Sequence, residues 1–273
     1  MKVDEGLVGI ADTRITTGSE VGQARKLYTF QRDQSSLFMM TSGLRSIRDK
    51  AITYFEESLT DGEGRYDRLY KAVNAFSRHI RQVSLEDKEA LEESGLRFNI
   101  HALIGGQFEH DSEHKLYLIY PQGNWIEIAE GTPYHIIGAS GYGKPILDRT
   151  LHYNDPMRHA FKVGCLAFDS TRISAADVDY PIDIVLYPRN SFRMVEHTYR
   201  KDDLADITTW WQERLRRSIK ELPSEWIDRA FAPLTPLEEF TRPPLGLDTG
   251  EAGAGLKPAS STPFPSISDT GAA

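Results

Sequence analysis

The first forty residues combine alternating apolar and polar positions with short apolar runs, both of which favour strands. The apolar spacing then changes to steps of three and four residues, which is typical of amphipathic helices. In chain order, the pattern predicts strands over residues 3–11, 25–31 and 35–43, helices over 44–59 and 66–85, and helix or loop over the acidic segment 86–94.

Strand patterns return near residue 97, separated by Gly-Gly and Pro-Gln-Gly turn signals. Two more helical patterns and one more strand follow. This part of the chain is predicted to form strands over 97–106, 114–123, 124–130 and 134–141, helices over 144–153 and 157–172, and a strand over 181–190.

Helices therefore come in pairs between groups of strands, which argues against a simple repeat of strand, helix and parallel strand. Paired helices around mostly antiparallel strands indicate stacked layers. We expect an α+β domain over residues 1–195 with the layer order helix pair, sheet, sheet, helix pair.

The character of the chain changes after residue 195. Residues 196–232 read as a helical extension that includes the adjacent Trp210 and Trp211 beside several arginines. These tryptophans are expected to pack either on the parent domain or on a neighbouring subunit. Residues 233–273 are rich in Pro, Gly, Ser, Thr and Ala and are predicted to be a disordered tail.

Composition narrows the class of protein. The chain has 273 residues, a net charge of -8 and 40% hydrophobic residues, which suits one large globular domain with appendages and disfavours nucleic acid as the main partner. Cys165 is the single cysteine, so no intrachain disulfide or Cys-rich zinc site is expected, and we interpret it as a small buried hydrophobe. Without a membrane-spanning run or a leader pattern, we expect a cytoplasmic protein without membrane contact.

Common catalytic motifs are absent, including the Gly-x-Ser-x-Gly elbow, the phosphate loop and His-Glu-x-x-His. His110 and His114 have a metal-like spacing, but their turn context favours a solvated hairpin. The remaining candidates are a strand that ends at Asp12, the nearby Lys26, and a strand that ends in Ser42-Gly43. A buried Asp–Lys pair alone is more often structural than catalytic.

Taken together and in order, these stretches resemble a known family. "DEGLVGIADTRITTG", "ARKLYTF", "MMTSG" and "IIGASGYGKPILDR", with "FDSTR" and "PIDIVLY", are similar to the proteasome β-subunit superfamily of N-terminal nucleophile hydrolases. The match is closest to the bacterial Anbu group of proteasome-like proteases. The resemblance covers about residues 2–215 and implies a four-layer αββα sandwich.

In that family, the nucleophile is the hydroxyl of an N-terminal threonine, and its own α-amino group accepts the proton. The resemblance implies that Lys26 lowers the pKa of the nucleophile, that Asp12 orients Lys26, and that the N–H of Gly43 stabilises the oxyanion. Thr41 is expected to line the pocket for the substrate side chain. Ser140, Ser174 and Asp177 are expected to hold the terminal amine and its water, and neither a metal nor an organic cofactor is implied.

The chain departs from the family pattern in two places. Family members begin with a threonine at the start of the first strand, whereas Met1 stands partway along that strand and no threonine precedes Asp12. We expect that the natural start lies upstream of Met1, the other explanation being a real loss that leaves an inactive subunit. The stretch Ser174-Ala-Ala-Asp177 also carries its serine and acid in exchanged order.

Three functions follow from the resemblance. The first is a threonine-type peptidase subunit of a self-assembled ring or helical stack that cleaves peptides or unfolded chains. The second is a catalytically inactive assembly subunit of the same fold. The third is an N-terminal nucleophile hydrolase acting on a small amide, which the fold alone does not exclude.

Overall fold

The computed structural model describes residues 1–17, 20–60 and 66–231. The chain divides into two compact units, Met1–Lys220 and Glu221–Ala273. In the second unit, the description covers residues 221–231, which include helix α6 (Glu225–Phe231). The tail predicted over residues 233–273 lies outside the described residues.

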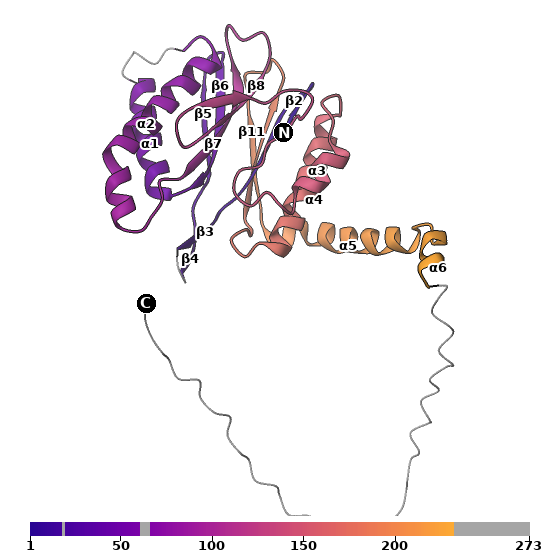
Figure 1. Ribbon diagram of the computed structural model, residues 1–273. Coiled ribbons are helices and arrows are strands. Elements are labelled where there is room, and N and C mark those ends of the chain that lie inside the picture. Colours follow the sequence, from indigo (N-terminus) through magenta and orange to yellow (C-terminus); the bar gives the residue numbers. More distant parts are fainter. Residues whose placement is uncertain (18–19, 61–65, 232–273) are drawn as a thin grey trace, which may run out of the picture. The chain divides into compact units, whose positions relative to one another are not determined.

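The first unit alternates groups of strands with pairs of helices, as the sequence pattern predicts (Figure 1). In chain order, its elements are β1 (Lys2–Val3), β2 (Gly6–Asp12), β3 (Arg14–Thr17), β4 (Glu20–Gln23), β5 (Leu27–Arg32), β6 (Ser35–Gly43), α1 (Arg45–Thr60), α2 (Leu69–Glu93), β7 (Ile100–Phe108), β8 (Lys115–Ile119), β9 (Trp125–Glu127), α3 (Lys144–Thr150), α4 (Met157–Ser174), β10 (Ile182–Pro188), β11 (Val195–Tyr199), the 3-10 helix η1 (Lys201–Leu204) and α5 (Ala205–Lys220).

Two antiparallel sheets face each other in the middle of this unit. One has the strand order β1-β2-β10-β11 and the other β5-β6-β7-β8-β9. In the first sheet, β2 pairs with β10 from Gly6 opposite Pro188 to Asp12 opposite Ile182. The hairpin β3–β4 forms a separate two-stranded sheet.

Helices cover both outer faces and complete four layers (Figure 1). One apolar cluster, which includes Phe55 and Phe76, joins α1 and α2 to the five-stranded sheet. A second, which includes Tyr187, fills the space between the sheets, and a third joins α3 and α4 to the other sheet. These three interior clusters confirm the predicted αββα sandwich, because each layer buries its apolar face against the next.

Several element boundaries differ from the sequence pattern. The strand predicted over residues 3–11 is a hairpin, because the chain turns at Asp4-Glu5 and β1 pairs back on β2. The segment predicted to be a strand over 134–141 is irregular and has no ladder bonds, whereas β11, which we did not predict, pairs with β10. Helix α2 also continues through the acidic segment to Glu93.

The helical region after residue 195 begins within the first unit. Leu204 packs with Ile182 and Ile184 of β10, and Ile207 at the start of α5 joins the same cluster. The compact unit therefore extends through Lys220. None of the helices in the described part of the chain is long and apolar enough to cross a membrane.

Candidate active site

The end of β2 and the residue before β5 bring an acid and a base together. The Nζ atom of Lys26 donates to Oδ1 of Asp12 at 2.8 Å, with 22% and 14% of the two side chains exposed. The backbone N–H of Arg14 donates to Oδ2 at 3.1 Å. Burial raises the pKa of the Asp12 carboxyl, and the hydrogen bond and charge of Lys26 oppose that rise. The Asp12 carboxylate is thus held by Lys26, directly before β5, and by the backbone of Arg14 at the start of β3.

This pair lines a cavity of about 610 Å³. Apolar side chains of the five-stranded sheet, including Met40 and Leu103, form one wall. Side chains of the α3–α4 layer, including Leu147 and Ala167, form another. The cavity therefore crosses the level of the four-stranded sheet, from the space between the sheets to the helices behind.

Among the residues that the structure describes, the cavity lies beside an unpaired edge of β2. Met1 donates its terminal N–H to the Val8 carbonyl at 2.8 Å, and the Val8 N–H donates to the Met1 carbonyl at 3.0 Å. Beyond this pair, residues 9–12 face the cavity, and within the described residues no strand pairs with them on the side opposite β10.

A segment without regular secondary structure lies across the cavity from β2. The N–H of Lys2 donates to the Pro133 carbonyl at 2.7 Å, so β1 lies between this segment and β2. Residues 135–139 continue from Pro133 and line the same cavity as residues 8–12. We call this space the strand slot, because it lies between β2 and residues 135–139 and continues the line of β1.

The amino group of Met1 stands at the entrance to the strand slot. It is buried, and desolvation lowers its pKa from 8.0 to about 5. A buried amine that makes its hydrogen bond in the neutral form is thus held near one end of the slot. Sequence reasoning did not anticipate this placement, because the hairpin that turns Met1 inward depends on tertiary packing.

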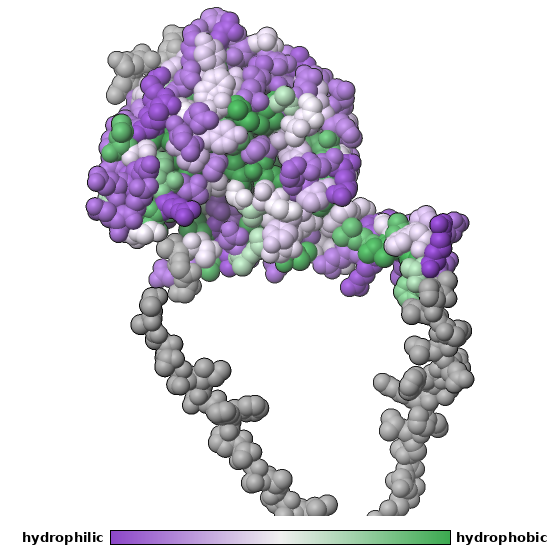
Figure 2. Space-filling view, in the orientation of Figure 1, coloured by the Kyte–Doolittle hydropathy of each residue, from purple (hydrophilic) through white to green (hydrophobic). Residues whose placement is uncertain are grey.

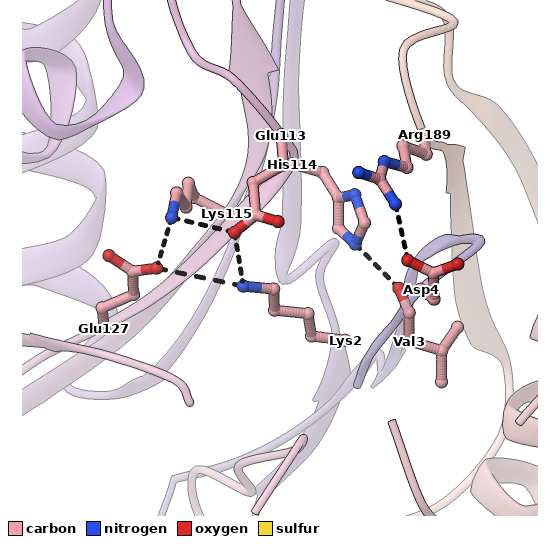
Figure 3. A network of polar contacts seen from close by, with 8 residues as sticks. All are labelled: Lys2, Val3, Asp4, Glu113, His114, Lys115, Glu127 and Arg189. Carbon is pink, nitrogen blue, oxygen red and sulfur yellow. Dashed lines mark hydrogen bonds and ion pairs between the residues drawn. The ribbon is translucent and has the colours of Figure 1, made fainter. Parts of the chain in front are cut away.

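A network of polar contacts fixes the direction of β1 (Figure 3). The Lys2 side chain is 3% exposed and lies 3.4 Å from Glu113 and 3.9 Å from Glu127. Lys115 bridges the same two carboxylates at 3.0 and 2.9 Å. Lys2 belongs to β1, whereas Lys115 and Glu127 belong to β8 and β9 and Glu113 lies just before β8. The network therefore links β1 to the opposite sheet.

His114 adds a second tie between the sheets. Its Nε2 atom lies 2.8 Å from the Val3 carbonyl and must donate, since a carbonyl only accepts (Figure 3). Burial lowers the pKa of His114, which favours the neutral ring. The expectation of a solvated hairpin at His110 and His114 is wrong for His114, which is fully buried, although His110 is exposed. Cys165 is buried, as expected.

The structure places Thr41 and Gly43 beside the Asp12–Lys26 pair in the same cavity. Thr41 is buried, and its Oγ1 has no hydrogen-bond partner among the described residues. The N–H of Leu44 donates to the Asn99 carbonyl at 2.9 Å. By the alternation of an antiparallel ladder, the N–H of Gly43 therefore points away from β7, toward the side of the sheet where Lys26 lies.

The other predicted residues are less closely grouped. Asp177 lines the cavity and has an exposed side chain, and Ser174, at the end of α4, is exposed and does not line it. Ser140 is also exposed and outside the lining, and its carbonyl accepts from the Lys144 N–H at the start of α3. The structure thus brings together Asp12, Lys26, Thr41, Gly43 and Asp177, but not the two serines.

Several solved structures have the same fold as this chain. Anbu (ancestral beta-subunit) from Yersinia bercovieri is 30% identical, with a TM-score of 0.76 over 82% of this chain and 96% of that one. The helical assembly of the Anbu complex from Pseudomonas aeruginosa is 30% identical, with a TM-score of 0.78 over 82% and 95%. An Anbu (Gly-1) mutant from Hyphomicrobium sp. strain MC1 is 29% identical, with a TM-score of 0.75 over 81% and 96%.

A comparison with protein-family models and another with curated proteins found no match. The solved structures nevertheless belong to the group that the sequence resembles, and the match covers 96% and 95% of their chains. Each of the two matches spans 82% of this chain at 30% identity. On this basis the chain belongs to the Anbu family of ancestral, proteasome-like β-subunits.

Proposed function

We propose that this protein is a threonine-type peptidase subunit whose nucleophile precedes Met1 in the full-length chain. The observation that carries the proposal is the strand slot, which leads from Met1 to the Asp12–Lys26 pair. A strand that filled the slot would deliver its first residue beside an ammonium group and a carboxylate.

The register of β1 and β2 supports this placement. Lys2 lies opposite Leu7, and Met1 lies opposite Val8 through a pair of hydrogen bonds. Each step upstream of Met1 advances one residue along β2, so the residue about four or five positions before Met1 reaches Asp12 or Thr13. Thr13 itself is a poor nucleophile candidate, because its hydroxyl donates to the Pro181 carbonyl.

The slot also constrains the kind of segment that fills it. One face of a strand in the slot would contact Met40 and Leu103, and the other would contact Leu147 and Ala167. A strand covered on both faces reads as a continuous apolar run instead of an alternating one. We therefore expect about four apolar residues between the threonine and Met1.

The proposed chemistry is acyl transfer in two steps. The threonine hydroxyl gives its proton to the terminal amine, directly or through a water, as its Oγ bonds to the substrate carbonyl carbon. The Lys26 ammonium, oriented by Asp12, stabilises the developing alkoxide, and the N–H of Gly43 donates to the oxyanion. The amine returns the proton to the leaving nitrogen, and water then hydrolyses the ester and restores the threonine.

Asp177 completes the proposed site, because it lines the cavity whereas Ser174 does not. We propose that it accepts a hydrogen bond from the terminal amine, while Thr41 contacts the substrate side chain. Ser140 and Ser174 would need a local rearrangement to reach the amine, because neither lines the cavity here. No metal or organic cofactor enters this mechanism.

The family relationship also supports a proposal about how copies of this chain assemble. The Pseudomonas aeruginosa relative forms a helical complex, which supports an oligomeric, proteasome-like assembly for this chain. We propose that peptides or unfolded chains reach the cavity from an enclosed surface of such an assembly.

An extension experiment tests the proposed function. The chain is produced with a threonine and about four Val or Ile residues directly before Met1, with the initiator methionine removed. The matched control begins with alanine. Hydrolysis of amide-linked fluorogenic peptides is expected for the threonine variant and not for the alanine variant.

Two results would overturn the proposal. A folded, assembled threonine variant that cleaves nothing would favour the inactive assembly subunit. A threonine variant that cleaves small amides but no peptides would favour the small-amide hydrolase.

A further inference from the structure

Helix α5 begins packed and continues without cover. Its first turns are anchored, since Ile207 packs near β10 and the Thr208 hydroxyl donates to Asp169 of α4 at 2.6 Å. None of its 16 residues is buried. An isolated helix of this length is marginal in water. Among the described residues, the second half of α5 therefore buries no apolar side chain, although such burial normally stabilises a helix.

An apolar stripe begins at the half-buried Trp211 and runs along the second half of α5. Trp211, Leu215 and Ile219 follow at steps of four and share one face, and Leu215 and Ile219 are 45% and 72% exposed. Figure 2 shows apolar surface over α5. Arg214 and Arg216 flank the stripe, because each is one residue away from Leu215 and so about 100° around the helix. We call residues 210–220 the basic end of α5.

An acidic surface of similar length lies on α2. Leu85 is 90% exposed, and Glu89 and Glu93 follow it at steps of four on the same face. We call residues 85–93 the acidic end of α2. Within it, Glu86 and Asp87 pair with Lys50, and Glu92 lies 3.8 Å from Lys88. The exposed Glu89 and Glu93 therefore present the acidic charge of this surface.

These two surfaces lie on opposite sides of the sandwich and cannot meet within one chain (Figure 1). We infer that the basic end of α5 docks on the acidic end of α2 in a second copy of this chain. Opposite charges steer and register such a contact, while the stripe on α5 covers Leu85. The inference rests on the oligomeric assembly proposed above but not on peptidase activity.

The contact joins two different surfaces, so it is heterologous. A pair of copies keeps an unused α5 on one copy and an unused α2 on the other, so further copies can add until the contacts close into a ring or continue as a helix. The contact would cover the apolar stripe that α5 exposes in a single chain.

Charge reversal tests the inference on the full chain. Variant A carries Arg214→Glu and Arg216→Glu, and variant B carries Glu89→Arg and Glu93→Arg. All four side chains are exposed, so thermal unfolding checks that each variant folds like the wild type. Each variant alone is expected to need at least about tenfold higher concentration than the wild type to assemble, measured by mass photometry and sedimentation velocity.

A mixture of the two variants tests whether complementary charges restore the contact. In the mixture, the acidic α5 of A meets the basic α2 of B, and the basic α5 of B meets the acidic α2 of A. Recovery of large assemblies with alternating subunits is the expected result. Unchanged assembly of A alone, a wild type that stays monomeric, or no recovery on mixing would each overturn the inference. Because mass is the readout, a lack of peptidase activity leaves these outcomes unaffected.

Discussion

Filling the strand slot should stabilise the protein measurably. The perturbation is an extension of about five residues before Met1, a threonine followed by Val and Ile, compared with an equally long extension of Gly, Ser and Asn. Both extensions convert the buried amine of Met1 into a peptide N–H, but only the apolar one matches both walls of the slot.

The size of the effect follows from the contacts that the slot offers. Burial of about four aliphatic side chains contributes about 6–12 kcal/mol. Ladder bonds to Ile10 and Asp12, the next hydrogen-bonded positions after Val8, contribute about 4 kcal/mol together. Fixing the backbone and side chains of the new residues costs about 10 kcal/mol.

Removal of the buried amine of Met1 adds a smaller contribution to the free energy of unfolding. With its pKa lowered from 8.0 to about 5, it must lose a proton on folding at pH 7, which costs about 1.4 kcal/mol. Its removal brings the net stabilisation by the apolar extension to about 4 kcal/mol. For a domain of this size, that corresponds to a rise in Tm of about 8–16 °C.

Differential scanning calorimetry at one protein concentration measures this change. The polar extension should gain only the contribution of the amine. Equal Tm values for the two extensions would refute the reasoning, because they would show that no strand enters the slot. A lower Tm for the apolar extension alone would do the same.

Other substitutions probe single groups. In the threonine-extended chain, Lys26→Met should lower kcat for peptides by about 10²–10³-fold while the assembled mass is unchanged. Gly43→Ala should lower the Tm, since φ is +112° and a Cβ would lie 2.2 Å from the Asn99 carbonyl oxygen, whereas Gly131→Ala, in open space, should not. In the chain that begins at Met1, stability should rise between about pH 5 and 8, because the unfolded amine binds the proton that the folded one releases. His114→Leu should lower the free energy of unfolding in urea by about 1–3 kcal/mol, and His114→Gln, whose amide can donate to Val3, should recover most of it.

The layer order and much of the helix placement could be predicted from periodicity. The stripe of Leu69, Val73, Phe76 and Ile80 along α2 is buried as its three- and four-residue steps require. Strand β6 is a short apolar run because both of its faces are covered, one by helices and one by the other sheet. Local pattern decided these elements, since each needs only its own residues to define an apolar face.

The candidate site was predictable only in part. Asp12 and Lys26 were linked by the family resemblance, and the structure places them 2.8 Å apart. Ser140, taken from the same resemblance, is exposed outside the cavity. The local sequence near Ser140 is compatible with either placement, because the position of an extended segment depends on which strand lies beside it.

The order of strands and helices and the apolar faces of α2 and β6 were thus determined by the sequence itself, because both depend on spacing along the chain. The hairpin at Asp4-Glu5, the burial of His114 and the strand slot were decided by tertiary structure. Each depends on a partner more than a hundred residues away, as when Lys2 meets Glu113 or Val3 meets His114. No local pattern records such a contact, because its free energy arises only when the two sheets pack together.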